Sequence, residues 1–314
     1  MKRRAFIQNT MAATALSMVP AWAKKLGISN LGIQLFSVPK YLSENFEGTI
    51  EMLAGMGYKE LEFYGPYSFS EQAAKDSWAQ AANMLGFSGS GLFGKSPQEI
   101  IQILTKYNLK ATATHTDLDT LEKNMDALAE TANMLGMKYV GLPAIPDQLR
   151  VNLDDYKKMA DRFNKIGMSA KKHGLKFSYH NHGYGFAEMD GKIPVIELFD
   201  HTDPENVILE MDLFWTAAAG ADPVNLLKKY KNRYQLLHIK DMTEHARFSG
   251  DGGDMTQWFA LFSKMTSCGE GVLDLPLILE TAKANGTKHF YVEQDMVSNP
   301  EKALKISADY LQEL

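Results

Sequence analysis

The sequence of 314 residues contains a single cysteine, Cys268, and this scarcity removes several kinds of site at once. One thiol can form neither an internal disulfide nor a thiolate cluster around a metal. A lone cysteine beside a glycine is more often a small packed hydrophobic residue than a nucleophile. The chemistry of this chain must therefore come from other side chains.

Basic runs and membrane-length apolar runs are also missing. The net charge is -5 with a pI of about 5.9, and three lysines or arginines are consecutive only at residues 2–4. Proteins that bind nucleic acid neutralise its phosphates with many lysines and arginines, so we expect no nucleic-acid partner. The apolar stretch at residues 11–19 is too short to cross a bilayer, so we expect no stable membrane span.

The first 23 residues have the order of an export signal. A basic start at residues 2–4 precedes an apolar stretch that ends in the small-residue segment 21–23. Its adjacent arginines resemble a twin-arginine signal, which directs folded bacterial proteins out of the cytoplasm. The alternative is the basic start of a general secretory signal. In either case we expect a periplasmic or otherwise exported protein whose mature part is residues 24–314.

From Leu31 onward the chain repeats one unit of a helix, a turn and a strand. Four times an apolar-periodic helix ends at a glycine, skips one residue and starts a strand at a lysine, at residues 57–59, 136–138, 174–176 and 286–288. Glycine suits the left-handed position after a helix, and the residues after it begin an extended run. The strands are short, apolar and not alternating, as expected for strands that are covered on both faces.

Eight strands can be counted, at residues 31–36, 59–64, 109–115, 138–142, 175–180, 207–212, 234–239 and 288–293. Eight strand–helix units predict an α/β protein with a single (β/α)8 TIM barrel. A doubly wound open sheet is the competing fold, but no glycine-rich nucleotide turn follows the first strand. Residues 65–108 and 240–287 are longer than one helix needs, so we expect extra helices over the rim there.

Polar side chains gather at the C-terminal ends of the predicted strands, which is the functional face of such a barrel. His180, Asp212, His238 and Glu293 end the fifth to eighth strands, and all four are ligand types for divalent metals. His182 lies two positions after His180 in extended chain, so both side chains should face the barrel mouth. A single histidine at a strand end is more often a structural hydrogen-bond partner. Four side chains that can bind a metal, all on one face, nevertheless predict an active site.

Further residues at this end are candidates for substrate contacts: Glu62, His115, Trp215, Asp241, Gln294 and Asp295. Trp215 has two open roles, stacking on a sugar face or packing beneath the loops. His115 can hydrogen-bond a substrate or only its neighbours. Asp241, Gln294 and Asp295 flank the ligands and suit supporting or hydroxyl contacts. Glu210, two residues before Asp212, is the replacement ligand if His180 does not bind.

The segments YHNH, LEMDLFW, AGADP, LLHIKD and YVEQD resemble those of the xylose-isomerase-like TIM-barrel superfamily, in particular its sugar phosphate isomerase/epimerase branch. The resemblance covers nearly everything after Lys24. It implies one divalent ion held by a glutamate, an aspartate, a histidine and a glutamate from strands five to eight. Asp212, His238 and Glu293 match this pattern. The fifth-strand Glu-Asn-His of the family is His-Asn-His here, at residues 180–182.

This departure changes the expected chemistry. With His180 as fourth ligand, two carboxylates and two imidazoles match the charge of a dication and favour Mn, Zn, Co or Fe over Mg. The resemblance implies a sugar isomerase or epimerase that removes a proton next to a carbonyl through a metal-stabilised enediolate. His182 or His180 would replace the missing glutamate as a base opposite Glu293, and Lys240 would add positive charge at the oxygen.

Two alternatives remain open from the sequence, both with a small carbohydrate as the partner. The same intermediate can eliminate a leaving group, which would make the protein a lyase or hydrolase of 3-oxo-glycosides. A non-catalytic exported sugar-binding protein is the other alternative. Apurinic-site endonuclease activity is disfavoured, because it needs several zinc ions and a cationic groove. The sequence leaves the oligomeric state open.

Overall fold

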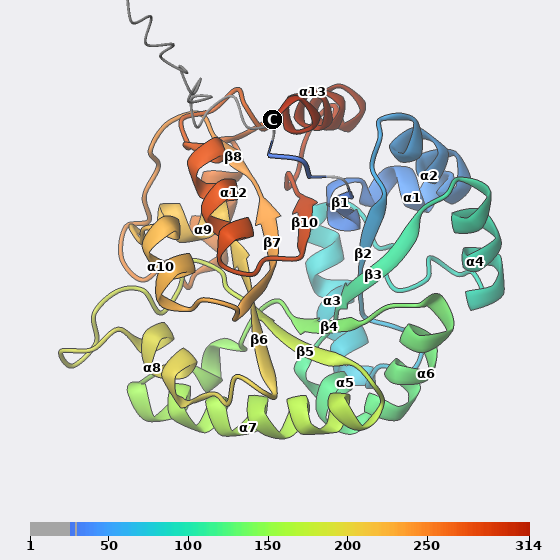
Figure 1. Ribbon diagram of the computed structural model, residues 1–314. Coiled ribbons are helices and arrows are strands. Elements are labelled where there is room, and N and C mark those ends of the chain that lie inside the picture. Colours follow the sequence, from blue (N-terminus) through green and yellow to red (C-terminus); the bar gives the residue numbers. More distant parts are fainter. Residues whose placement is uncertain (1–25, 29) are drawn as a thin grey trace, which may run out of the picture.

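The computed structural model describes residues 26–28 and 30–314, and its centre is a closed barrel of eight parallel strands (Figure 1). The order around the barrel is β1-β10-β7-β6-β5-β4-β3-β2. The strands are β1 (Leu31–Gln34), β2 (Glu60–Tyr64), β3 (Lys110–His115), β4 (Tyr139–Leu142), β5 (Lys176–His180), β6 (Val207–Asp212), β7 (Tyr234–Ile239) and β10 (His289–Val292). The predicted TIM barrel is confirmed, strand by strand. The predicted signal at residues 1–23 lies outside the described residues.

Helices cover the outside of the barrel: α1 (Pro39–Glu44), α2 (Phe46–Gly55), α3 (Gln72–Leu85), α4 (Pro97–Lys106), α5 (Leu118–Lys123), α6 (Met125–Leu135), α7 (Leu153–Lys172), α8 (Pro194–His201), α9 (Leu213–Ala218), α10 (Pro223–Lys229), α11 (Met255–Phe262), α12 (Leu275–Ala284) and α13 (Pro300–Glu313). In the described part of the chain, no helix combines the length and the apolar character that a bilayer crossing requires.

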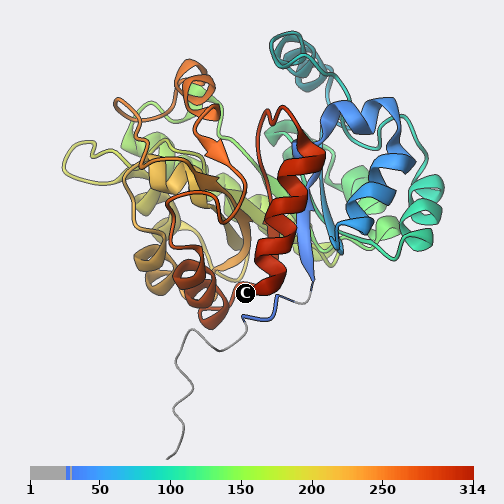
Figure 2. The same cartoon turned by 90° about the horizontal axis from the view of Figure 1, so that it is seen from above.

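Both long segments carry the extra structure that their length predicts. The segment after β2 forms α3 as well as α4, and the segment after β7 forms α11, α12 and the short antiparallel pair β8 (Asp241–Met242) and β9 (Met265–Thr266). Figure 2 shows α3, in teal, and α11, in orange, projecting from the same side of the molecule. These two insertions are therefore placed to shape a binding site on that side of the molecule.

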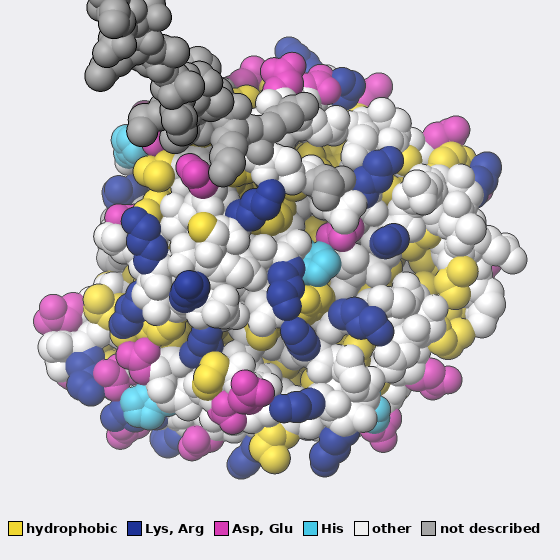
Figure 3. All heavy atoms as spheres, in the orientation of Figure 1, with side chains coloured by type: hydrophobic (Ala, Val, Ile, Leu, Met, Phe, Trp, Pro, Cys, Tyr) yellow, Lys and Arg dark blue, Asp and Glu magenta, His cyan; other side chains and the backbone are white. Residues whose placement is uncertain are grey.

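The repeated glycine turns have the backbone conformation that the sequence predicts. Gly57, Gly136, Gly174 and Gly286 have φ angles of 100°, 80°, 73° and 105°, in the region where a side chain is disfavoured. The lysine two residues after each of them stands at the start of a strand, at the end of the barrel opposite the predicted site. Lysine and arginine side chains gather on the face seen in Figure 3.

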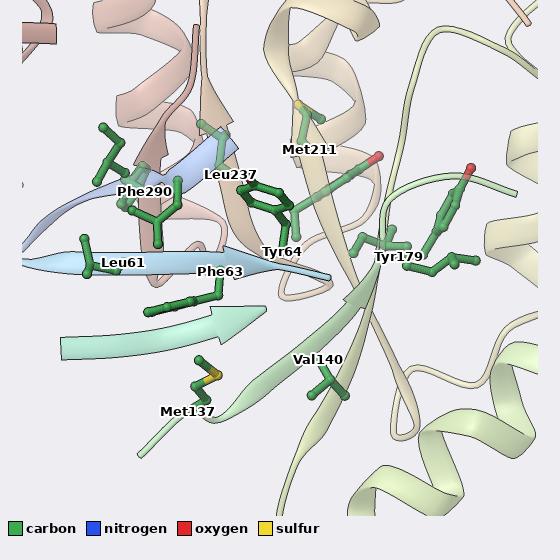
Figure 4. Packing of buried hydrophobic residues seen from close by; sticks show 14 of the residues in the cluster. Leu61, Phe63, Tyr64, Met137, Val140, Tyr179, Met211, Leu237 and Phe290 are labelled. Atoms are coloured by element: carbon green, nitrogen blue, oxygen red, sulfur yellow. The ribbon is translucent and has the colours of Figure 1, made fainter. Parts of the chain in front are cut away.

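The outer face of the barrel wall and the barrel interior each have their own hydrophobic cluster. Outward-facing residues such as Leu61, Phe63 and Val140 are fully buried between strands and helices (Figure 4). Each such side chain contributes about 1.5–3 kcal/mol by leaving water. Inside the barrel a smaller apolar plug is formed by Ala113, Tyr139, Ile208, Leu236 and Tyr291. Above this plug, toward the C-terminal strand ends, the interior becomes polar.

Cys268 is a packed residue, as the sequence predicts for a lone cysteine. Its side chain is 2% exposed, and burial raises the pKa of its thiol to about 12. The reactive thiolate is therefore nearly absent at pH 8. We expect no reaction of the native protein with an aromatic disulfide reagent at pH 8, and one thiol per chain after denaturation. Rapid reaction of the native protein would contradict the burial of this side chain.

Candidate active site and metal centre

A cavity of about 380 Å³ opens at the C-terminal end of the barrel, where the sequence predicts the site. One part of its lining is polar and comes from four strands or the residues that follow them: His115, His180, His182, His238, Lys240, Glu293 and Asp295. The remaining part is largely apolar and includes Phe36, Tyr64, Pro66, Trp78 and Leu142. The cavity thus joins a charged region to an aromatic wall.

The residues nearest the mouth form what we call the upper layer: Asp212, His238, Lys240 and Glu293. One ligand atom each of Asp212, His238 and Glu293 lies within 4.8 Å of the others. The Nδ1 atom of His238 is 2.8 Å from Oε2 of Glu293. Asp212 also begins α9, because its Oδ1 accepts a hydrogen bond of 2.8 Å from the backbone N–H of Trp215. Its Oδ2 takes no part in this cap and lies 2.9 Å from the ammonium of Lys240, a position that a metal cation could take over.

Lys240 supplies the positive charge of the upper layer. Its ammonium nitrogen lies 2.9 Å from Asp212 Oδ2, 2.7 Å from Glu293 Oε2 and 2.6 Å from Asp295 Oδ2. Burial alone would lower the pKa of Lys240, but these carboxylates outweigh it and raise the pKa well above its usual value. Lys240 therefore remains protonated. A metal bound to Asp212 and Glu293 would leave Asp295 as the partner of the ammonium.

A second group of ligand types lies one step further into the barrel, and we call it the deep layer: Glu62, His115, His180 and Glu210. The imidazole nitrogen Nε2 of His115 is 2.7 Å from Glu210 Oε2 and 3.5 Å from Glu62 Oε1. His180 lies between the layers, with Nδ1 at 3.8 Å from Glu210 Oε2 and Nε2 at 3.6 Å from Asp212 Oδ2. His238 links them too, because its Nε2 is 2.5 Å from Glu62 Oε2.

His182 is held differently from the other histidines. Its Nδ1 lies 2.6 Å from the carbonyl oxygen of Pro143 and must donate to it, which leaves a lone pair on Nε2. Burial, and then the charge of Lys240, lower the pKa of His182 to about 3, so the ring is neutral. It stacks on Trp258 of α11, with ring centroids 4.7 Å apart. A neutral, oriented imidazole in the cavity lining can accept a proton.

The donor set of the upper layer fits a divalent metal. The carboxylates of Glu62, Glu210, Asp212, Glu293 and Asp295 are all buried. Lys240 is the one lysine buried with them in the described chain, so the carboxylates outnumber the ammonium by four. This excess must be balanced by protons on groups such as His238 or by a bound cation. Buried charge is costly unless it is paired or coordinates a metal. Asp212, His238 and Glu293 would hold the ion, and His180 is the predicted fourth ligand.

The family of the chain can be determined from its sequence. A family model described as "Xylose isomerase-like TIM barrel" matches residues 50–314. The chain belongs to this family.

Several known proteins resemble the chain along most of its length. An inosose dehydratase of Mesomycoplasma hyopneumoniae (strain 7448) is 27% identical over 281 residues, which cover 81% of this chain and 91% of the relative. A sugar phosphate isomerase/epimerase from Parabacteroides distasonis superposes with a TM-score of 0.70 at 22% identity, over 90% of this chain and 93% of the other. The IolI protein with a bound zinc atom superposes with a TM-score of 0.62 at 17% identity, over 90% and 95% of the chains.

Four predicted substrate contacts lie outside the cavity lining: Glu62, Trp215, Asp241 and Gln294. Glu62 belongs to the deep layer. Trp215 is 2% exposed and packs beneath His182, with ring centroids 5.9 Å apart. The carboxylate of Asp241 accepts backbone N–H groups of residues 242, 269, 271 and 273, so it organises the segment after β7. Gln294 is anchored through its backbone N–H, which donates to the hydroxyl of Ser37.

One aromatic residue of the site has no signal in the sequence. Trp258 stacks on His182, and its indole N–H donates to the carbonyl of Gly252 at 2.7 Å. The length of the segment after β7 predicts a helix there, but not which of its side chains meets the site. Only the packing of α11 against the barrel mouth identifies Trp258.

The affinity of this protein for its metal should rise with pH. Burial would lower the pKa of His238, but Glu293, Glu210 and Glu62 outweigh it and raise this pKa well above its usual value. The metal-free imidazole therefore carries a proton at neutral pH, and coordination must displace that proton. We expect the Kd for Zn²⁺ to fall about tenfold per pH unit in this range. Calorimetry in buffers of different ionisation heat measures the released proton, and zero release at pH 7 would contradict the prediction.

Proposed function

We propose that the protein is a divalent-metal-dependent lyase acting on a polyhydroxylated carbonyl compound. It removes a proton from the carbon next to the carbonyl and expels a leaving group from the following carbon. The observation that carries this proposal is one cavity lined by a neutral imidazole, an ammonium and three of the four predicted metal ligands, His180, His238 and Glu293. The relatives named inosose dehydratase support it, because a dehydratase is a lyase that expels water.

A divalent ion held by Asp212, His238 and Glu293 would polarise the carbonyl oxygen and so acidify the neighbouring C–H bond. His182 accepts the proton from carbon through its free Nε2, because its Nδ1 is engaged with Pro143. Lys240 places its charge where negative charge develops on the substrate oxygen. The zinc atom in IolI supports zinc as one candidate metal, and Mn, Co and Fe suit the same donors.

Asp295 is the candidate proton donor to the leaving group. It lines the cavity, and burial, followed by the charge of Glu293, raises its pKa to about 7. A carboxyl group with this pKa holds a proton for part of the time at neutral pH and can return it to a departing oxygen. Its contact of 2.6 Å with Lys240 fixes its position.

The lyase reaction suits these residues better than isomerisation or epimerisation, which the sequence places first. Moving a proton between faces or carbons of a sugar requires two groups on opposite sides, and the family uses two glutamates. Here Glu293 remains, while the other position is His180, which is 2% exposed and lies against Glu210 and Asp212. Elimination requires one base and one acid, and His182 and Asp295 supply them.

A second candidate substrate is a 3-oxo-glycoside, favoured by the aromatic wall of the cavity. The rings of Phe36 and Tyr64 meet edge to face with their centroids 5.3 Å apart, and the ring centroid of Tyr64 lies 5.8 Å from that of Trp78 in α3. Free inososes are polar on all sides and do not need such a wall. An apolar aglycone would contact it while the oxidised sugar ring lies among the charged residues. In this version the expelled group is the aglycone.

Incubation of the zinc-loaded protein in deuterated water distinguishes these reactions. The panel contains an inosose, an aryl 3-oxo-glucoside, an aldose and a ketose, and proton NMR follows each. We expect loss of water from the inosose or release of the aglycone, and no release after chelation of the metal. Deuterium that enters an otherwise intact sugar would instead establish an isomerase or epimerase. Sugar binding without any reaction would favour the non-catalytic alternative.

A further inference from the structure

The deep layer replaces part of the barrel core with titratable side chains. TIM-barrel interiors are normally filled by layers of branched apolar residues. Here such residues end at the apolar plug around Leu236 and Tyr291. Next along the strands come Glu62, His115, His180 and Glu210, exposed by 0%, 6%, 2% and 0%. A fold that buries four such groups in its centre needs a compensating interaction there.

Several atoms of the deep layer that could bind a metal make no hydrogen bond. Within residues 26–28 and 30–314, these buried atoms are Oε1 of Glu62, Oε1 of Glu210 and Nδ1 of His180. The two carboxylate oxygens have only longer contacts with imidazoles, 3.5 Å from Glu62 to His115 and 3.3 Å from Glu210 to His238. Each unsatisfied buried polar atom costs about 1–3 kcal/mol. All three belong to side chains that converge on the same part of the interior. Unpaired acceptor atoms that converge in this way are the arrangement a cation would satisfy.

The spacing of these atoms suits an ion the size of zinc. Bonds of 2.0–2.1 Å to a tetrahedral zinc ion place its ligand atoms about 3.3 Å apart. In the deep layer, His115 Nε2 is 3.5 Å from Glu62 Oε1, and His180 Nδ1 is 3.8 Å from Glu210 Oε2. One ligand atom each of His115, His180, Glu210 and His238 lies within 4.8 Å of the others. Small movements of these side chains would close the group around one ion.

The charges of the two layers also favour two metal ions. Once metal binding has displaced the imidazole protons and all five buried carboxylates are ionised, the carboxylates outnumber the ammonium of Lys240 by four. One dication in the upper layer would halve this charge, and a second dication would cancel it. The ammonium of Lys240 lies against Asp212, Glu293 and Asp295, all closer to the mouth, so it does not pair with Glu62 or Glu210.

We propose that the deep layer is a second divalent-metal site, formed by His115, His180 and Glu210 and completed by Glu62. A neutral imidazole has one lone pair, so His180 can ligate one ion only. Its Nε2 lies 3.6 Å from Asp212 and its Nδ1 lies 3.8 Å from Glu210, but Nδ1 is the buried nitrogen without a hydrogen bond. Ligation through Nδ1 assigns His180 to the deep ion and leaves Asp212, His238 and Glu293 to the upper one. This proposal does not depend on the reaction that the protein catalyses.

Neighbouring residues are consistent with a built site. His238 can donate its Nε2–H to Glu62 while its Nδ1 serves the upper ion, the arrangement by which carboxylates orient metal-binding histidines. Gly141 of β4 makes room for His115, because a Cβ there would lie 2.9 Å from the ring atom Cδ2. The histidine that replaces the family glutamate on the fifth strand thus becomes the ligand that the second ion needs.

Metal counting tests the proposal with the metal alone. We expect about two Zn²⁺ per chain in the dialysed full-length protein by mass spectrometry of the elements, and one in Glu210→Gln. Asp212→Asn should also retain one, and the double variant none. His173→Ala, which removes a partly exposed histidine paired with Asp126, is the control and should leave the count unchanged. Circular dichroism verifies that each variant is folded.

The possible outcomes separate the two sites. A parent protein with one Zn²⁺ that Glu210→Gln does not remove would overturn the proposal. A single Zn²⁺ that is lost in Glu210→Gln and kept in Asp212→Asn would support the deep site and contradict the upper one. If the variants do not fold, a Co²⁺ titration of the parent followed in the visible range still decides. Two saturation steps support the proposal, and one step contradicts it.

Discussion

Asp212→Asn should lower turnover by about 10³-fold or more while leaving the fold intact, since the loss concerns charge stabilisation at the reacting centre. The amide oxygen of asparagine can still cap α9 by accepting the N–H of Trp215, as Oδ1 of Asp212 does. What it removes is the carboxylate charge at Oδ2, which faces the predicted ion and Lys240. Zinc bound to the upper layer should be lost together with activity. Steady-state kinetics and metal analysis on the same preparation measure both effects.

Asp222→Asn is the matched control for this prediction. Asp222 begins α10, and its Oδ1 accepts backbone N–H groups of Val224 and Asn225, but it belongs to neither of the two groups of candidate metal ligands. This variant removes the same charge from the same kind of helix cap. Its metal content and its turnover should equal those of the parent. Full activity of Asp212→Asn would mean that Asp212 serves α9 and nothing else.

His182→Gln should keep the bound metal and lose roughly 10²–10⁴-fold in kcat, the usual contribution of a general base. His182 belongs to neither of the two ligand groups of the barrel. Glutamine can still donate to the carbonyl of Pro143, but its amide cannot accept a proton from carbon. Unchanged zinc content with a large fall in kcat therefore separates a base from a ligand. Exchange of the substrate C–H with deuterium should fall in parallel.

The control for this variant is His201→Gln. His201 also has its Nδ1 against a backbone carbonyl, at 2.7 Å from Glu197, but it is exposed at the end of α8. Its replacement should change neither metal content nor kcat. If His182→Gln lowers zinc content instead of kcat, His182 is a ligand and the proton is taken by another residue.

The barrel can be predicted from the sequence because its signals are local. Each helix-to-strand turn is marked by a glycine with positive φ, as at Gly57 and Gly286, and each strand is a short apolar run. The polar residues at strand ends follow from the same pattern, since parallel strands bring their carboxyl ends to one face. The sequence alone therefore predicts that His180, His182 and the upper-layer residues lie at the mouth of the barrel.

The depth of each side chain in the barrel cannot be predicted in this way. Strand pairing shifts by one residue between Leu61 and Glu62 and again between Leu209 and Glu210. Such irregularities change the height at which a side chain enters the interior, and they depend on the neighbouring strand. Glu62 therefore lies beneath the mouth beside Glu210 rather than on the rim.

The role of Asp241 also cannot be predicted from the sequence. Asp241 follows Lys240 directly, as a residue of the rim would, but its carboxylate binds backbone N–H groups from Gly269 to Leu273. Those partners come from a segment about thirty residues later in the chain, with no pattern that links the two. Contacts between distant loops are set by tertiary packing, which local patterns do not encode.

A crystal structure of the zinc-loaded protein, with anomalous data collected at the zinc edge, tests the central claim most directly. The account predicts an anomalous peak in the upper layer, bounded by Asp212, Glu293 and Nδ1 of His238, with the ammonium of Lys240 turned to Asp295. The absence of any peak there, with Lys240 still held between Asp212 and Glu293, would contradict it.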